Sequence, residues 1–355
     1  MKTLSYEDLL NVPPYSLPQK EKGPFLTQQL LALTQYHLKH CPSYKNILQG
    51  IQFKASRVEK IDQIPFIPVR LFKDLELSSA APEDIVKIMT SSGTTGQKVS
   101  KIYLDKETSI NQQKTLIKIV SDSIGKDRLP MLIVDSPSVL QNRKMMSARG
   151  AGILGFMLFA SDKHYVLNDE MNVDVKGVHA FLKKHRDKPI LIFGFTFMIW
   201  RYLKEMQIPI PNGILIHGGG WKKLKEEAVS PSIFKQTLKK NLGLSKVYDY
   251  YGMVEQTGSV YMECEKGYFH ASIFSDVILR RESDFSVCNT QEKGIIQVLS
   301  MLPKSYPGHS ILTEDVGILL GEDNCACGRL GKYFIVQGRL KNAEIRGCSD
   351  TFERS

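Results

Sequence analysis

Between residues 130 and 250, short apolar segments alternate with stretches of helical periodicity. Such alternation is typical of an α/β fold with a largely parallel sheet, because each helix returns the chain to the edge where the next strand begins. It therefore predicts a mostly parallel sheet with flanking helices. Strands are expected at 130–135, 190–195, 214–217 and 246–250, and helices at 175–184 and from Trp221 onward.

On either side of this region the pattern differs. From about residue 261, short strands separated by turns predict a β subdomain; they are expected at 267–271, 276–280, 294–299, 316–320 and 333–336. Near the N-terminus, apolar spacing predicts a helix over 25–40, and the two prolines of IPFIPVRLFK (64–73) predict an extended segment. The expected division is a helical lead-in (1–60), an α/β core (61–260), a β subdomain (261–338) and a terminal segment (339–355).

Charge and composition narrow the function classes. The chain of 355 residues has a formal net charge of +10, which favours anionic ligands. Its basic residues are scattered and form no recognisable nucleic-acid module, so no nucleic-acid partner is expected. The start has no leader pattern and the longest apolar runs are too short for a membrane span. The six cysteines then indicate a reducing, cytoplasmic setting.

A polar loop, TSSGTTG, lies between two expected short strands, 85–89 and 101–104. Glycines allow close backbone approach, and backbone N–H groups with hydroxyls form anion-binding concavities. The loop therefore predicts a phosphate cradle, although it lacks the GxxxxGK[ST] spacing of a P-loop and a plain polar linker is the alternative. Its members are Thr90, Ser91, Ser92, Gly93, Thr94, Thr95 and Gly96.

Further motifs follow this loop in order: HGGGWK (217–222), DYYGMVEQTG (249–258), TED (313–315) and GRLKNAEIRG (338–347). From about residue 60 onward, this order resembles the adenylate-forming superfamily of acyl- and aryl-CoA ligases. IPFIPVRLFK, GGGWK and RGCS look most like the acyl-protein synthetases of bacterial fatty-acid reductases, the LuxE family. Glu263-Cys264 and the string CACGR (325–329) are similar to phenylacetate-CoA ligases.

The resemblance implies the large N-terminal domain of an adenylate-forming enzyme, with an ATP site built from these motifs. The polar loop would hold the β- and γ-phosphates, and Glu255 would bind magnesium, since Mg²⁺ prefers carboxylate oxygen. Asp315 would accept hydrogen bonds from the ribose hydroxyls, and Arg339 would support ribose or phosphate. Tyr251 would stack on adenine beside the backbone of Gly218, Gly219 and Gly220. Taken one at a time, the three glycines could be a plain strand-to-helix turn, Tyr251 a core aromatic and Glu255 a surface carboxylate.

The chain's end departs from the superfamily pattern. Members normally continue beyond the GR hinge into a small mobile C-terminal domain that carries a catalytic lysine. Here eight residues follow Gly347, so we expect that domain to be absent. Another cation would then serve the first step, with Lys98, Lys101 or Arg346 as candidates, unless a partner chain supplies one.

Cys348 lies in this terminal context, two residues after Arg346. A neighbouring cation lowers a thiol pKa and favours the nucleophilic thiolate. The match of RGCS to the family implies that Cys348 accepts the acyl group as a thioester. The alternative is an exposed cysteine without a role.

Four other residues predict a metal site. Cys264, His270, Cys325 and Cys327 offer three sulfurs and one imidazole, a ligand set that structural zinc sites use. Their spacing differs from the usual CxxC pairs. They are either a structural zinc site or small core residues with a satisfied histidine.

Together these features predict an ATP-dependent acyl-protein synthetase. It would activate a fatty or related carboxylic acid to acyl-AMP, transfer the acyl group to Cys348 and deliver it to a partner, an acyl reductase or another acyl-accepting protein. Residues 153–159 and 193–200 would line an apolar acyl tunnel or belong to the core. The alternatives are an acyl- or aryl-CoA ligase of the phenylacetate type and a non-catalytic nucleotide-binding scaffold.

Overall fold

A computed structural model describes residues 5–91, 98–140 and 145–340. These residues form two compact units: unit 1 holds 5–91, 98–123 and 252–340, and unit 2 holds 124–140 and 145–251. No helix in the described part of the chain is long and apolar enough to cross a membrane.

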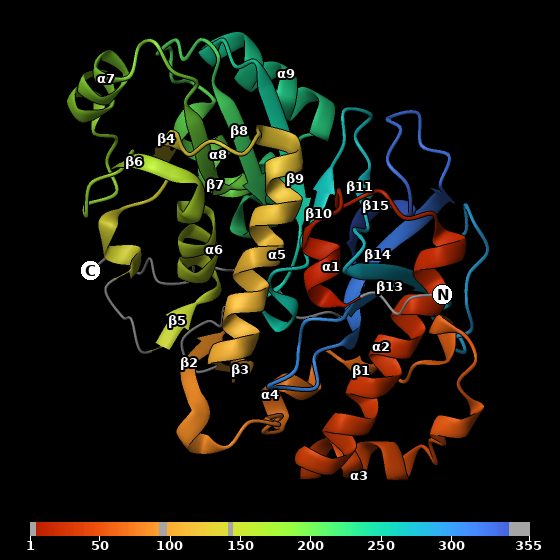
Figure 1. Cartoon of the computed structure of the whole chain (residues 1–355). Helices are drawn as coiled ribbons and strands as arrows, with labels where there is room; N and C mark the ends of the chain where they lie inside the picture. The colour runs from red at the N-terminus through yellow and green to blue at the C-terminus, as the bar shows by residue number, and fades with distance from the viewer. Residues whose placement is uncertain (1–4, 92–97, 141–144, 341–355) are drawn as a thin grey trace. The chain divides into compact units, whose positions relative to one another are not determined.

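Unit 2 contains the expected parallel sheet. Its strand order is β6-β4-β7-β8-β9, and each neighbouring pair is parallel (Figure 1). The strands are β4 (Leu129–Ile133), β6 (Ala160–Tyr165), β7 (Leu191–Phe195), β8 (Ile214–Gly218) and β9 (Lys246–Tyr251), and the short β5 covers Met145–Ser147. Parallel strands end at a common edge, so this order brings the ends of β8 and β9 together.

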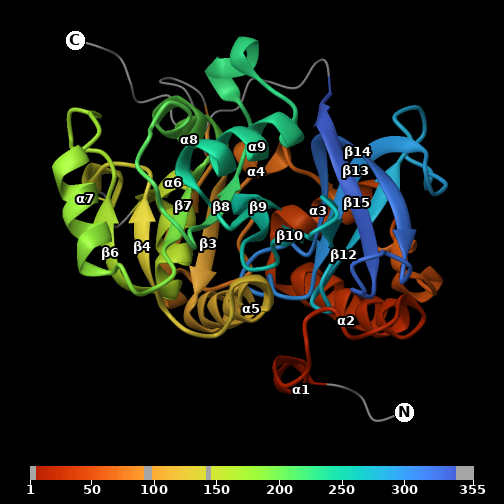
Figure 2. The same cartoon turned by 90° about the horizontal axis from the view of Figure 1, so that it is seen from above.

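Helices cover the sheet of unit 2. They are α6 (Ala148–Phe156), α7 (Val175–Lys184), α8 (Thr196–Leu203) and α9 (Pro231–Leu242). The apolar sides of α7, α8 and α9 share one buried core with the sheet (Figure 2). Helix α6 contributes Phe156, whose ring stacks on Phe193 of β7 at 4.2 Å between centroids. The helices therefore fix the strands whose ends carry the predicted motifs.

Unit 1 is largely antiparallel. Its strand order is β12-β13-β14-β15-β11-β10, with the short β1 parallel to β14. The bounds are β1 (Ile67–Pro68), β10 (Tyr261–Glu263), β11 (Phe269–His270), β12 (Ser275–Arg280), β13 (Lys293–Ser300), β14 (Ser310–Glu322) and β15 (Lys332–Arg339). A separate antiparallel pair joins β2 (Ile85–Thr90) to β3 (Lys101–Asp105). Most of these strands lie beyond residue 261, where short strands were predicted, and they share unit 1 with the helices of the N-terminal region.

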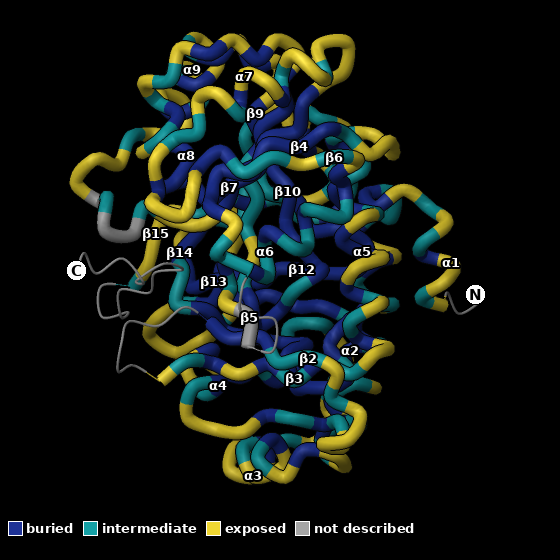
Figure 3. Tube along the Cα trace, turned by 90° about the vertical axis from the view of Figure 1, so that its left-hand side faces the viewer, coloured by how far each residue is buried: buried dark blue, intermediate teal, exposed yellow. Residues whose placement is uncertain are grey.

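The helices of unit 1 include α1 (Tyr6–Leu10), α2 (Gln19–His40), α3 (Pro42–Gly50), α4 (Leu71–Asp74) and α5 (Lys106–Ile124). Leu26 and Leu30 of α2 pack against Ile278 and Leu299 of β12 and β13. This packing follows from helical spacing, which places both leucines on one face. In Figure 3 most strands have the dark blue of buried residues, whereas the yellow of exposed residues lies on the outer sides of helices such as α2 and α3.

Besides the early start of β14, at Ser310 rather than at residue 316, three predictions of element bounds were wrong. Helix α2 begins at Gln19 rather than after Pro24. Pro24 lacks the N–H that would continue the helical ladder, but tertiary contacts hold the first turn. The Gln19 backbone N–H donates to Asp323, and its side-chain amide donates to Asp276 at 2.7 Å. Long-range hydrogen bonds therefore outweigh the proline.

The other two concern segments 64–73 and 221 onward. In segment 64–73, only Ile67–Pro68 forms a strand. Leu71–Asp74 forms a short helix, which is possible because no proline follows Pro68 in this segment. After Trp221 the chain forms a kinked 3₁₀ segment, Lys222–Glu227, before α9 begins. Ser230 caps α9 and Pro231 is its first residue, and a residue before proline is extended, so the helix starts afresh there.

Candidate functional site

The predicted phosphate loop begins at the C-terminal end of β2. Thr90 and Ser91 are buried, and the Ser91 backbone N–H donates to the Ser100 carbonyl at 3.1 Å. The Ser100 N–H in turn donates to the Ser91 hydroxyl oxygen at 2.8 Å. These two bonds close the base of the loop. Ser92, Gly93, Thr94, Thr95 and Gly96 lie outside the described residues.

The candidate cations are only partly described. Lys98 is 78% exposed and its ammonium lies 3.9 Å from Asp74, a surface ion pair that contributes little stability. Lys101 begins β3. Arg346 and the predicted acyl acceptor Cys348 lie outside the described residues.

Asp315 and Arg339 are brought together by the β14–β15 register, in which they are direct partners. Arg339 Nε lies 3.3 Å from Asp315 Oδ1, and Arg339 Nη2 lies 3.1 Å from Glu314 Oε2. Sequence reasoning placed the Thr313–Asp315 motif before the last strands, but it lies within β14. The Thr313 hydroxyl donates to the Ile296 carbonyl at 2.7 Å, which explains how polar residues fit inside a strand.

Glu255 lies in a 3₁₀ turn, Val254–Gln256, and is 3% exposed. The turn is held by the Gln256 amide, which donates to the Gly308 carbonyl at 2.9 Å. Gly308 allows this approach, because a Cβ there would lie 2.8 Å from the Glu255 carbonyl oxygen. Burial raises the pKa of Tyr306, and the charge of Glu255 adds to the rise. The carboxylate is therefore held in a fixed, mostly buried position rather than on the surface.

In unit 2 the glycine motif and the tyrosine motif meet at adjacent strand ends. Gly218 pairs with Tyr250 in the β8–β9 register. Gly219 has φ +77°, a conformation that favours glycine, and its missing Cβ faces the ring of Phe195 at 3.2 Å. The tyrosine that packs against Gly218 is Tyr250, whereas Tyr251, predicted to stack on adenine, is the next residue of β9 and points to the opposite face. The sequence signal was present in the doublet Tyr250-Tyr251.

Thr196, which sequence reasoning missed, holds Gly218 and also contacts His217. The Thr196 hydroxyl donates to the Gly218 carbonyl at 3.2 Å and lies 3.0 Å from His217 Nδ1. Burial lowers the pKa of His217 to about 3, so the ring is neutral. Thr196 follows β7 directly, which is the type of strand end where such polar residues occur.

The two apolar runs considered for an acyl tunnel lie mainly in the core of unit 2. Ile153, Phe156 and Phe159 are buried in the first run. Phe193, Phe195 and residues 198–200 are buried in the second. Tyr250 packs on Phe156 at 5.0 Å between ring centroids, so this aromatic group reaches the glycine motif.

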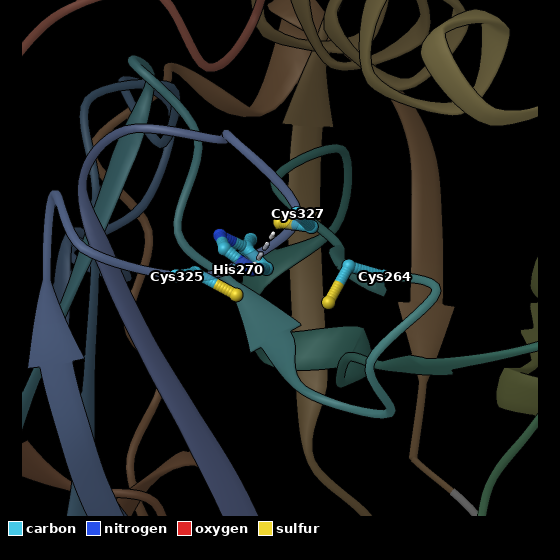
Figure 4. Close-up of side chains that lie close together, drawn as sticks. All are labelled: Cys264, His270, Cys325 and Cys327. Atoms are coloured by element: carbon cyan, nitrogen blue, oxygen red, sulfur yellow. Dashed lines mark hydrogen bonds between the residues drawn. The ribbon is translucent and has the colours of Figure 1, made fainter.

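Unit 1 also holds the predicted cysteine–histidine cluster. The ligand atoms of Cys264, His270, Cys325 and Cys327 all lie within 4.8 Å of one another, and the residues converge from three segments (Figure 4). Cys264 follows β10, His270 is in β11, and the other two lie between β14 and β15. His270 Nε2 is 3.4 Å from the sulfur of Cys327. The four thiol and imidazole groups form a donor set that could hold a metal ion.

Burial and a nearby arginine set the charge state of the cluster. Burial raises the pKa of Cys325 to about 12, whereas for Cys327 the raising effect of burial is outweighed by hydrogen bonds from Arg329 and the neighbouring thiols, which lower its pKa. Burial and the charges of Arg329 and Lys22 lower the pKa of His270 to about 4. Sequence reasoning quoted Arg329 in its motif but gave it no role.

Comparisons with known proteins show which family this chain is similar to. The family model described as "Acyl-protein synthetase, LuxE" matches residues 3–355. A long-chain-fatty-acid–luciferin-component ligase of Aliivibrio fischeri is 26% identical over 307 residues, covering 80% of this chain and 76% of the relative. Its Vibrio harveyi counterpart is 22% identical over 329 residues, covering 89% and 84%. Both relatives are ligases, as expected for this chain.

The solved structure of 2-hydroxyisobutyryl-CoA ligase, in an open conformation with 2-HIB-AMP and CoA, superposes with a TM-score of 0.70 at 12% identity. The match covers 92% of this chain and 72% of that chain. This likeness confirms the predicted fold of an adenylate-forming enzyme. With the family model matching nearly every residue, the chain belongs to the LuxE family of acyl-protein synthetases, ATP-dependent ligases.

Proposed function

We propose that this protein activates a fatty or related carboxylic acid with ATP and then carries the acyl group on Cys348. The observation that carries the proposal is the family match over residues 3–355, which spans the predicted phosphate loop, Glu255, the Asp315–Arg339 pair and the RGCS motif. The fold of an adenylate-forming enzyme supports the first step.

The residues for ATP in unit 1 have suitable chemistry. The loop that begins at Thr90 would receive the phosphates through backbone N–H groups and hydroxyls. Asp315 offers carboxylate oxygens for the ribose hydroxyls, and Arg339, already beside it, supplies positive charge. Glu255 is a hard oxygen donor in a fixed position, which fits Mg²⁺. When bound there, magnesium would neutralise phosphate charge.

In unit 2, the proposed adenine site is the edge formed by Gly218, Gly219, Gly220 and Tyr251. The glycines leave backbone accessible beside the strand ends. Tyr251 is half-buried and can present a ring face to a base. Tyr250, on the opposite face of β9, packs against Gly218.

The chemistry then has two steps. A carboxylate oxygen of the acid attacks the α-phosphorus of ATP, forming acyl-AMP as the bond to pyrophosphate breaks. The thiolate of Cys348 attacks the acyl carbon, forming a carbon–sulfur bond as AMP leaves. Lys98 is the proposed cation for the first step.

The proposal also covers the acyl acceptor, the substrate and the metal. The acyl-enzyme would hand its chain to a partner protein, such as an acyl reductase, in the cytoplasm. The names of the A. fischeri and V. harveyi relatives support a long-chain fatty acid as substrate. At the cysteine–histidine cluster the proposed metal is zinc, in a structural role outside the reaction.

Intact-protein mass spectrometry tests the central claim. The protein is incubated with ATP, Mg²⁺ and a panel of fatty acids, and we expect a mass gain of one acyl group that hydroxylamine removes. Cys348→Ser should release pyrophosphate yet form no adduct, whereas Cys288→Ser should still form it. Pyrophosphate release with acyl-CoA formation and no adduct would instead identify a CoA ligase. ATP binding without pyrophosphate release would identify a scaffold.

A further inference from the structure

The connection between β14 and β15, residues 323–331, contains neither helix nor strand. It carries Cys325 and Cys327, whereas Cys264 and His270 belong to the β10–β11 hairpin. Within the connection, the Gly328 N–H donates to the Cys325 carbonyl at 2.9 Å, which makes a tight turn that presents both sulfurs to the hairpin. A metal bound by all four ligands would therefore join the connection to the hairpin.

The N-terminal segment before α2 rests on the same connection. The Leu330 N–H donates to the Tyr15 carbonyl at 3.1 Å. The Gln19 N–H donates to Asp323 Oδ2 at 2.8 Å, and the same carboxylate accepts from the Gly331 N–H at 2.7 Å. These bonds make the position of residues 15–19 depend on the position of the connection.

Side-chain contacts of Tyr15 reach the cluster itself. Tyr15 is 7% exposed, and its ring meets the imidazole of His270 edge-on, with centroids 5.9 Å apart. The guanidinium carbon of Arg329 lies 5.4 Å from the centre of the Tyr15 ring, within range of a cation–π interaction. The N-terminal segment therefore packs directly on the ligand His270 and on Arg329, which follows the ligands Cys325 and Cys327.

Arg329 extends the arrangement to α5. Its guanidinium donates to Asp122 near the end of α5, at 3.0 Å, and to Glu265 of the hairpin turn, at 2.8 Å. Three thiolates and a neutral imidazole around Zn²⁺ leave a net charge of −1. The positive charge of Arg329, which also pairs with Asp122 and Glu265, lies beside this site, as outer-shell partners of metal ligands commonly do.

We propose that one Zn²⁺, bound by Cys264, His270, Cys325 and Cys327, fastens connection 323–331 to the hairpin and, through the connection, fixes the N-terminal segment 15–19. The inference rests on the zinc proposed above and adds what the ion holds in place. Four protein ligands leave no open position for a substrate, and tetrahedral bonds of about 2.3 Å place sulfurs roughly 3.8 Å apart. The observed limit of 4.8 Å needs only a small contraction.

Metal content is the first measurement. We expect about one zinc per chain in protein purified without chelator, by inductively coupled plasma mass spectrometry. Cys264→Ser and the half-buried Cys327→Ser should lose it. Cys288→Ser is the matched control, because Cys288 is also a buried free thiol of unit 1 but is not among the cluster residues. Wild-type protein without zinc that also fails to bind added Zn²⁺ would overturn the metal site.

Hydrogen exchange then tests the fastening. Chelator treatment of full-length wild-type protein avoids reliance on variants that fail to fold. We expect amides of 13–22 and 323–331 to exchange at least about tenfold faster without metal, with no change in the β12–β13 hairpin (281–293). Zinc present but unchanged exchange in both segments would overturn the fastening role. Neither readout uses ligase activity, so a failed acylation assay is a separate result.

Discussion

The ring of Tyr250 occupies the space where a side chain at Gly218 would begin: a Cβ there would lie 2.5 Å from the nearest ring carbon. The two residues are partners in adjacent parallel strands. The ring cannot easily withdraw, because Phe156 and Phe193 pack on it at 5.0 and 6.3 Å between centroids. The glycine motif and the tyrosine motif therefore depend on each other.

Gly218→Ala should destabilise the protein by about 1–3 kcal/mol, because the added methyl group forces the packed tyrosine or the backbone to move. Gly220→Ala is the control, since nothing lies within 4 Å of a Cβ at that position. It should change the free energy of unfolding by less than about 0.5 kcal/mol. Urea denaturation measures both, and equal effects would contradict the close approach.

Asp315→Asn should weaken ATP binding by roughly 10- to 100-fold, because hydrogen bonds to a charged carboxylate contribute about 1.5–3 kcal/mol. Glu314→Gln provides a matched control. Both carboxylates pair with Arg339, at 3.3 Å for Asp315 and 3.1 Å for Glu314. Both variants therefore lose one ion pair, but only Asp315 has a proposed ribose contact.

The measurement is the KM for ATP in pyrophosphate release. We expect a raised KM for Asp315→Asn and an unchanged KM for Glu314→Gln. Similar losses in the two variants would show that the ion pair with Arg339 matters, rather than a contact to the ribose.

Stability should fall as the pH drops below about 6.5, and two stacked histidines in unit 1 contribute part of this fall, beside His217 and His270. His37 and His309 lie 5.0 Å apart between ring centroids and are both buried. Burial lowers the pKa of His37 to about 3 and that of His309 well below its usual range, where the His37 charge would add to the effect. Their hydrogen-bond partners are neutral, among them the Ser79 hydroxyl at 2.7 Å and the Thr34 hydroxyl at 2.9 Å.

The sign follows from proton counting. With native pKa values below the unfolded value of about 6.5, the unfolded chain binds more protons, so each histidine removes up to about 1.4 kcal/mol per pH unit as the pH falls from 6.5 toward 3. Urea denaturation at pH 7.5, 6.5 and 5.5 measures the slope. His37→Asn should flatten it, whereas His179→Gln, at an exposed position, should not. A slope that His37→Asn leaves intact would contradict the prediction.

The sequence predicted unit 2 well because its signals are local. Helix α7 has the predicted bounds, and β7, β8 and β9 differ from prediction by one residue at an end. Buried parallel strands are continuous apolar runs, and glycine or proline marks their ends. The composition of the cysteine–histidine cluster was also readable, since few other ligand sets combine sulfur and imidazole.

Features that depend on distant partners were missed. The early start of α2 depends on Asp276 and Asp323, more than 250 residues away. Thr313–Asp315 lies within β14 because the Thr313 hydroxyl finds a carbonyl on β13. Arg329 gains its place beside the cluster from Asp122, on a helix far back in the chain. None of these partners is visible in a local window of sequence.

Glu255→Gln should abolish most magnesium-dependent activity while leaving the fold intact. The amide is close in size to the carboxylate, and Glu255 is 3% exposed in a turn that hydrogen bonds of Gln256 hold. The change removes the negative charge that a hard cation requires. We expect pyrophosphate release to fall roughly 10²–10³-fold, the range found when one charge-stabilising group is removed.

A Mg²⁺ titration of pyrophosphate release separates this role from a loss of stability. Gln256→Ala is the control, because it removes the bonds that the amide donates to the Gly308 and Val298 carbonyls, at 2.9 and 3.4 Å, yet keeps the carboxylate. It should lower the free energy of unfolding by about 1–3 kcal/mol with an unchanged half-saturating Mg²⁺ concentration, provided that Glu255 keeps its position. Glu255→Gln should show the reverse, with near-normal unfolding and a half-saturation raised beyond measurement. If the two variants respond alike to Mg²⁺, the carboxylate supports the turn and another residue binds the cation.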